Sequence, residues 1–237
     1  MLIVIAIAGF LIGFSKAGVG GTLGPFITVL VALTMPADDA IGLLLPMLII
    51  ADWSTMTAHW GQWERPIVLR LLVASAVGIA FGSTLVGSVS EPVLRTLIAA
   101  AMLVFAAYYL ATKTQIAAHL ALKRAWPAGL VSGFVSALAH LGGPPVFAYL
   151  LTTDLKPRKF VATSAALFAI TNLLKVPAYF LAGLFDGEVI GSVWYAWLTI
   201  PVGVVVGRSL VGRIDRDVFD RITTTLLIFS ALVLMVT

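Results

Sequence analysis

Eight apolar segments account for most of this chain and leave only short polar connections between them. They span residues 2–34, 40–60, 66–88, 92–111, 126–152, 159–183, 189–212 and 217–237. A membrane-crossing helix needs about 20 consecutive apolar residues, so each segment is long enough for one helix. Only 11% of the residues are charged, whereas a globular domain carries about 25%. The sequence therefore predicts an all-α polytopic membrane protein.

The counts of charged and ligand-forming residues exclude several other classes of function. The net charge of +4 forms no basic face of the kind that binds nucleic acid. The chain has no cysteine, only three histidines and no H-E-x-x-H sequence, which argues against metal sites and cysteine nucleophiles. Ser136 and His140 are four residues apart, but no acidic residue nearby would orient them as a catalytic pair. We expect no enzyme activity, no cofactor, no metal and no nucleic-acid partner.

The two halves of the sequence resemble each other. Residues 77–110 align with 202–235 without gaps, and the spaced glycines of the two stretches coincide. We expect these glycines to form helix-packing faces; they are Gly78, Gly82, Gly87, Gly203, Gly207 and Gly212. The Gly-Phe pair at 13–14 recurs at 133–134, and each pair is followed by two glycines and a proline. The pattern indicates an internal duplication.

We therefore expect an N-terminal repeat, a basic cytoplasmic linker and a C-terminal repeat within one membrane domain, at residues 1–111, 112–125 and 126–237. Loop charge indicates that the repeats are inverted, because cytoplasmic loops are enriched in Lys and Arg. The loop at 36–39 carries two aspartates, whereas its counterpart at 156–159 carries three basic residues. The sign of the charge also reverses between the other equivalent loops.

An inverted repeat needs an odd number of crossings, so one of the four segments in each half should not cross. The first and fifth segments are broken by glycines, at 18–21 and 141–145. Basic residues on both sides of the fifth place both its ends in the cytoplasm. We predict that each repeat is a re-entrant broken-helix hairpin followed by three transmembrane helices. No charge orients the N-terminus, so a full crossing by the first segment is the alternative.

The two glycine breaks are the candidate substrate site. Non-helical backbone at membrane depth is tolerated only where protein buries it or water reaches it. A proline near the start of a second half-helix follows each break, at Pro25 and at Pro144. The unpaired N–H groups and the helix dipole at such a start attract anions. We expect the two half-helix starts to face each other at the midplane, as in transporters of anionic substrates; helices merely kinked and packed by small residues are the alternative.

The duplicated four-segment halves and two glycine-proline motifs resemble the sulfite exporter TauE/SafE family, also called the four-toluene sulfonate uptake family. The motifs read S-K-A-G-V-G-G-T-L-G-P from Ser15 and S-A-L-A-H-L-G-G-P-P from Ser136. The resemblance covers essentially the whole chain and implies a plasma-membrane transporter of sulfite or organosulfonates. Thr22 and Pro144 stand where such families usually show a third glycine, and His140 stands where small residues are more usual. These departures bear on which anion is carried.

Ionisable residues inside membrane segments are functional candidates. Lys16 precedes the first break, within reach of an anion there. Asn172 and Lys175 share a helix face at i, i+3, so Asn172 could donate to a sulfonate oxygen while Lys175 supplies charge. Asp52 lies close to the repeat equivalent of Asn172. It could be a counter-ion for a lysine, a protonatable coupling group or part of a structural ion pair. Snorkelling to the interface is the alternative for both lysines.

The remaining candidates flank the breaks; they are Ser15, Gly20, Gly21, Thr22, Ser136, His140, Gly142 and Gly143. The hydroxyls bind an anion or helix carbonyls, and His140 titrates or binds a carbonyl freed at the break. We predict a secondary carrier or facilitator in which the two halves rock around the anion in alternating access. An anion channel of the same architecture is the alternative. The expected partners are a small anion and the lipid bilayer. The sequence leaves open whether the chain forms a homo-oligomer.

Overall fold

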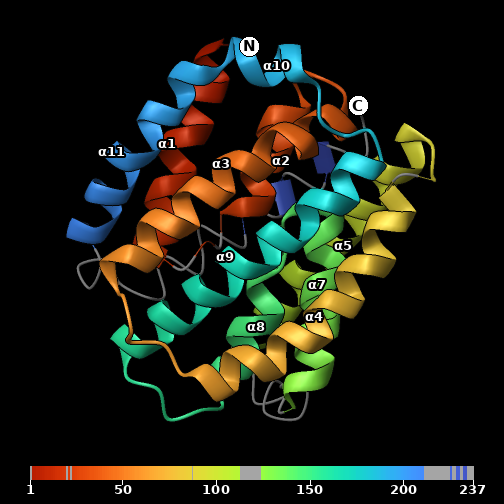
Figure 1. Ribbon diagram of the computed structural model, residues 1–237. Helices are drawn as coiled ribbons and strands as arrows, with labels where there is room; N and C mark the ends of the chain where they lie inside the picture. The colour runs from red at the N-terminus through yellow and green to blue at the C-terminus, as the bar shows by residue number, and fades with distance from the viewer. Residues whose placement is uncertain are drawn as a thin grey trace.

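The computed structural model describes residues 2–19, 21, 23–86, 88–112 and 124–210, with five isolated positions beyond them (225, 228–229 and 232–233). The described residues form helices and no strand (Figure 1), which confirms the all-α prediction for this part of the chain. The helices are α1 (Leu2–Val19), α2 (Gly24–Ala32), α3 (Ala37–Ala58), α4 (Arg65–Val86), α5 (Glu91–Thr112), α7 (Ala125–Ala139), α8 (Gly143–Leu150), α9 (Pro157–Leu181), α10 (Gly187–Ser192) and α11 (Trp194–Leu210). Most of the expected linker and of the last apolar segment lie outside the described residues.

Several of these helices are suited to a bilayer. Among the described residues, three helices are long and apolar enough to cross a membrane, over Ala37–Thr57, Arg65–Val86 and Lys159–Leu181. Three shorter apolar helices accompany them, in α1, α5 and α7. Large apolar side chains are exposed on the outer faces, among them Phe81 at 66% and Phe180 at 72%. An apolar exterior of this kind suits lipid contact rather than water.

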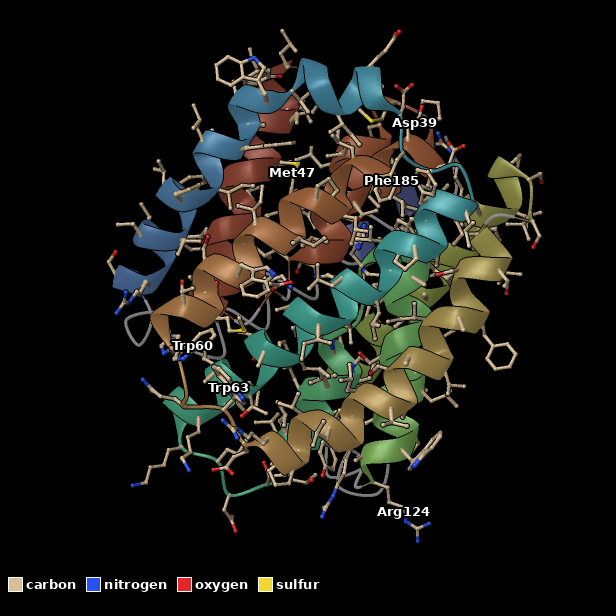
Figure 2. The ribbon with its side chains drawn as sticks, viewed as in Figure 1. Asp39, Met47, Trp60, Trp63, Arg124 and Phe185 are labelled. Carbon is tan, nitrogen blue, oxygen red and sulfur yellow. The ribbon has the colours of Figure 1, made fainter. Side chains whose placement is uncertain are left out.

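The first and fifth apolar segments are each divided into two helices. α1 and α2 lie in the upper half of the molecule, and α7 and α8 lie in the lower half (Figure 1). The N-terminus and Asp39, near the start of α3, both lie at the upper end, whereas Arg124, just before α7, lies at the lower end (Figure 2). Lys159 in the first turn of α9 pairs with Glu64, beside Trp63 at that lower end. The first divided segment therefore begins and ends at the upper end of the molecule. The second divided segment begins and ends at the lower end.

Two details differ from the sequence expectation. Gly18 lies inside α1, and the backbone turns at Gly21, whose φ is +88°. The seventh apolar segment is divided as well, because α10 ends at Ser192 and α11 begins at Trp194. The short α10 is started by Asp186, whose carboxylate accepts from the N–H groups of Glu188 and Val189. This capping fixes a separate helix ahead of α11.

Helices from opposite halves of the sequence pack as close pairs, α1 with α11 and α4 with α7. A Cβ atom at Gly78 would lie 2.1 Å from the carbonyl oxygen of Leu130, and one at Gly203 would lie 2.1 Å from that of Phe10. Such distances leave no room for any side chain, so these glycines let two backbones touch. The expectation of glycine packing faces is confirmed at these two positions. It is also confirmed at Gly82 and Gly207, where a Cβ atom would lie 2.6 and 2.4 Å from a backbone carbonyl oxygen. Gly87 and Gly212 lie outside the described residues.

The partner helices contribute matching glycines. A Cβ atom at Gly13 would lie 2.1 Å from the carbonyl oxygen of Ile200, and one at Gly133 would lie 2.1 Å from that of Ser75. Each close pair is thus lined by glycines from both of its helices. The Gly-Phe pairs that recur in the two halves of the sequence therefore sit at close backbone contacts between helices.

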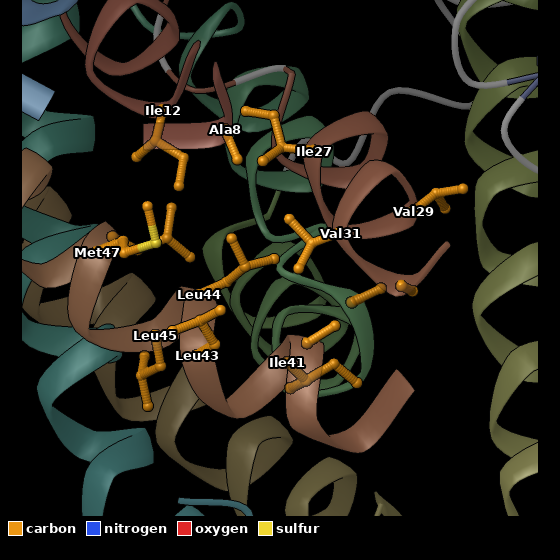
Figure 3. Packing of buried hydrophobic residues seen from close by; sticks show 14 of the residues in the cluster. Ala8, Ile12, Ile27, Val29, Val31, Ile41, Leu43, Leu44, Leu45 and Met47 are labelled. Atoms are coloured by element: carbon orange, nitrogen blue, oxygen red, sulfur yellow. The ribbon is translucent and has the colours of Figure 1, made fainter. Parts of the chain in front are cut away.

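α3 runs through the middle of the molecule. Consecutive residues Leu43, Leu44 and Leu45 are all buried, so apolar neighbours surround this stretch of the helix. Figure 3 shows these side chains packed with others from α1 and α2, such as Ile12 and Val31. This central helix carries Asp52 into the interior, where α9 packs beside it.

Candidate functional site

The first break, between α1 and α2, satisfies much of its own backbone. Ser15 accepts at its carbonyl oxygen from the N–H of Gly21 at 2.8 Å, and at its hydroxyl oxygen from the N–H of Leu23 at 3.1 Å. The N–H of Gly24 bonds to the carbonyl of Gly21 at 3.3 Å. Two N–H groups at the start of α2 therefore already have acceptors within the chain. The Ser15 side chain thus holds the backbone of Leu23, the residue that precedes this half-helix.

Gly21 also makes room for the lysine of the first motif. A Cβ atom at Gly21 would lie 3.0 Å from Cδ of Lys16. The positive φ of Gly21 is a conformation that glycine adopts without strain. The turn thus lets the Lys16 side chain run past the break toward the interior.

The second break, between α7 and α8, is built around His140. The helix α7 ends with His140 in the left-handed region, at φ +55°, and its N–H bonds to the carbonyl of Ser136 at 3.1 Å. The Ser132 hydroxyl donates to the carbonyl of Gly142 at 2.7 Å. α8 then begins with Gly143 and two prolines, which have no N–H. Any N–H donors at this start therefore come from the two glycines.

The two breaks touch each other. A Cβ atom at Gly24 would lie 3.0 Å from the carbonyl oxygen of His140. The hydroxyl of Thr28 lies 3.0 Å from the carbonyl oxygen of Gly24 and 3.2 Å from that of Ala139, so it bridges α2 and α7. The start of α2 and the end of α7 are therefore in direct contact in the middle of the fold.

A buried ion pair lies beside this contact. Nζ of Lys16 is 2.7 Å from Oδ1 of Asp52, whose side chain is fully buried. The other carboxylate oxygen accepts from Nδ2 of Asn172 at 2.5 Å. Lys16 also lies over the ring of Phe168, 4.6 Å from its centroid. Both oxygens of Asp52 therefore have protein partners.

A second basic residue, Lys175, lies on α9 one helical turn after Asn172. Lys175 is fully buried, and its Nζ lies 3.3 Å from the carbonyl oxygen of Ser136, 3.2 Å from the Ser136 hydroxyl and 3.0 Å from Nδ1 of His140. These three neutral acceptors match the three N–H groups of an ammonium. No carboxylate in the described part of the chain pairs with Lys175.

The neighbours of His140 fix its tautomer. Nε2 lies 3.1 Å from the carbonyl oxygen of Ile41 on α3. A carbonyl oxygen only accepts, so Nε2 carries the hydrogen and Nδ1 is left to accept from Lys175. His140 is thus a neutral ring that links α7, α3 and α9.

Comparison with known proteins supplies the family. The model of the sulfite exporter TauE/SafE family matches residues 3–234, nearly the whole chain. This chain belongs to the TauE/SafE family. No curated protein and no solved structure matches it. TauE/SafE proteins are membrane transporters and not enzymes, as the sequence analysis expected.

The TauE/SafE chain brings most of its predicted site residues together. One group joins Lys16, Asp52 and Asn172, and the other joins Ser136, His140 and Lys175. Gly142 lies against the second group, since a Cβ atom there would be 3.2 Å from the Ser136 hydroxyl. Gly143 opens α8, and Ser15 and Gly21 belong to the first break. Gly20 and Thr22 lie outside the described residues.

Two of these residues are engaged differently from what was expected. Asn172 donates to Asp52, whereas the sequence suggested donation to a substrate. The carbonyl that His140 binds belongs to Ile41 on another helix, not to the break itself. In both cases the partner comes from α3, whose position beside the breaks has no local sequence signal.

Sequence reasoning missed three polar or aromatic contributors. Ser132 lies one turn before Ser136 on α7, so its spacing already placed it on the same face. Phe168 lies four residues before Asn172 on α9 and contacts Lys16. The Tyr179 hydroxyl donates to the carbonyl of Ala137 at 2.7 Å. The i, i+4 positions around the predicted site residues Ser136, Asn172 and Lys175 were therefore the signal that could have found them.

Proposed function

We propose that this protein is a secondary transporter of a sulfur oxoanion, such as sulfite or an organosulfonate, and that the anion binds beside Lys175. The supporting observation is that the amino group of Lys175 is fully buried and that its three partners are all neutral. A charge buried without a counter-ion is costly. A bound anion would supply the missing charge.

The surroundings of Lys175 offer donors to an oxoanion. The Ser136 hydroxyl accepts from Lys175, so its own hydrogen is left for an acceptor. Gly142, at the start of α8, has no side chain with which to cap the helix, and its backbone lies against Ser136. An anion seated there would meet the positive end of the α8 dipole. We assign the role of anion site to the second break because the first has its donors occupied by Ser15 and Gly21.

We propose further that the two halves are inverted repeats in the plasma membrane. Support comes from the equivalent glycine contacts of Gly13 and Gly133 and from the opposite ends at which the two hairpins open. The lower end in Figure 2 carries Arg124, and the upper end carries Asp39. By the positive-inside rule, we propose that the lower end faces the cytoplasm.

The burial of the site favours a carrier over a channel. Asp52 and Lys175 are both fully buried, and the two breaks are in contact at Gly24 and His140. A channel needs a continuous wet path past its selective site, whereas a carrier encloses the site between two access states. We therefore propose alternating access, with the described structure in a state that is closed on both sides.

Flux measurements in proteoliposomes test this function. The purified protein should take up radiolabelled sulfite with saturable, counterflow-capable kinetics, and Lys175→Met should abolish uptake. Lys159→Met is the matched control, because Lys159 is a surface lysine of the same helix. Uptake by Lys175→Met at the wild-type rate would exclude Lys175 from the site. Ohmic single-channel current would contradict the carrier.

A further inference from the structure

We propose that the buried charge of this site selects monovalent anions over divalent ones, an inference that rests on the proposed anion site at Lys175. The site should then bind a sulfonate monoanion or hydrogen sulfite more tightly than sulfate or the sulfite dianion. The charge at the two breaks comes from the ionisable groups that α1, α3, α7 and α9 bring there.

Lys16 and Asp52 cancel each other. Their charged atoms are 2.7 Å apart, and the second carboxylate oxygen accepts from the neutral amide of Asn172. The pair therefore contributes no net charge to the site. Within the pair, the carboxylate of Asp52 is the half that faces Asn172 on α9, one turn from Lys175.

His140 and Tyr179 contribute no charge either. His140 donates from Nε2 to Ile41 and accepts at Nδ1 from Lys175, which is the hydrogen-bonding pattern of a neutral imidazole. The Tyr179 hydroxyl donates to the Ala137 carbonyl, so the phenol keeps its proton. A second proton on His140 would point at the ammonium of Lys175 and is disfavoured by that contact.

One positive charge remains. Lys175 has three acceptors for three N–H groups, and the described chain pairs it with no carboxylate. An anion bound beside Lys175 holds it as an ammonium, so the protein groups around that anion carry a net charge of +1. One monovalent anion makes the enclosed site neutral. A divalent anion leaves an excess negative charge in a place that water does not reach, next to the carboxylate of Asp52, which is unfavourable.

Two tetrahedral probes whose charges are constant near neutral pH test the inference in the full chain in detergent. Methanesulfonate carries one negative charge, and sulfate carries two. Titration followed by thermal unfolding gives an apparent affinity, because a ligand that binds only the folded state stabilises it. We expect methanesulfonate to bind at least about tenfold more tightly than sulfate.

Changing the charge of the cluster should change this preference. Asp52→Asn keeps the shape of the side chain and raises the net charge to +2, so the ratio should shift toward sulfate by about tenfold or more. The double substitution Lys16→Met with Asp52→Asn returns the net charge to +1 and should restore the preference for methanesulfonate. The double variant adds no unpaired buried charge to the one at Lys175 that the wild-type protein already has, so it remains informative if Asp52→Asn fails to fold.

The outcomes separate the inference from the proposed function. Equal affinity of the wild-type protein for both probes, or tighter sulfate binding, would overturn charge selection while leaving the anion site in place. A sulfate preference in the double variant would overturn it as well. If neither probe stabilises the wild-type protein against thermal unfolding, the anion site at Lys175 is refuted. The same holds if the probes stabilise Lys175→Met as much as they stabilise the wild-type protein.

Discussion

Asn172 donates a hydrogen bond of 2.5 Å to Asp52, and the two residues are separated by 120 positions in the chain. The same separation relates Gly13 to Gly133, the glycines at the two closest helix contacts. Residues at corresponding places of two repeats meet one another only near the symmetry axis that relates those repeats. A pseudo-twofold axis between Asp52 and Asn172 would thus place the ion pair and Lys175 at the centre of the proposed transporter.

The buried ion pair should make Lys16 important for stability as well as for transport. Lys16→Met leaves the carboxylate of Asp52 buried without its cation, and breaking such a pair typically costs about 3 kcal/mol or more. We expect a lower unfolding temperature in detergent. Adding Asp52→Asn should recover most of the loss, because an amide needs no counter-ion. A double variant less stable than Lys16→Met alone would contradict this account.

Gly13 and Gly133 should tolerate no side chain. An added methyl group would lie 2.1 Å from a carbonyl oxygen in either case, so α1 must separate from α11, or α7 from α4. We expect Gly13→Ala and Gly133→Ala to lower the yield of folded protein in size-exclusion chromatography to a similar extent. Gly191→Ala, which meets nothing within 4 Å, is the matched control and should leave the yield unchanged or raise it.

Ser15 should act through the backbone of the first break. Ser15→Ala removes the acceptor for the buried N–H of Leu23, and leaving a buried donor unsatisfied costs about 1 kcal/mol or more. Unfolding temperature should fall while anion affinity at the second break stays near the wild-type value. Ser209→Ala serves as a control, because the exposed Ser209 hydroxyl donates only to Val206 in its own helix. A selective loss of anion affinity in Ser15→Ala would place Ser15 in the binding site instead.

His140 should be a neutral Nε2–H tautomer. The ring lies between the carbonyl of Ile41 and the ammonium of Lys175, and only this tautomer satisfies both partners. Nitrogen NMR of histidine-labelled protein distinguishes the two ring nitrogens, and substitution of His59 and His119 by Gln assigns the His140 signals. An Nδ1–H signal from His140 would contradict the arrangement and remove Nδ1 as an acceptor for Lys175.

The sequence predicted the helices and the two breaks because both leave local signals. Apolar runs mark the helices, and the glycines and prolines mark where the backbone departs from them. The repeat also placed Asp52 near the equivalent of Asn172. These features depend on spacing along the chain, which the sequence contains.

The partners of the ionisable residues could not be predicted in the same way. Lys16 pairs with Asp52 on α3, and Lys175 meets Ser136 and His140 on α7; both pairings depend on how the helices cross. The first half-helix start was expected to offer unpaired N–H groups, yet Ser15 and Gly21 accept from two of them. A serine side chain that reaches eight residues along a turn leaves no periodic pattern to read.

The pairing of α1 with α11 has a consequence for how the protein is made. Leu2–Val19 is synthesised first, and its glycine face packs on Trp194–Leu210, which is synthesised much later. At about 5–20 residues per second, α1 exists for roughly 10–35 s before its partner leaves the ribosome. During that time the exposed backbone around Gly13 must rest against lipid or the insertion machinery. The N-terminal half therefore cannot complete its own packing in advance, and the last described helix closes the structure around the first.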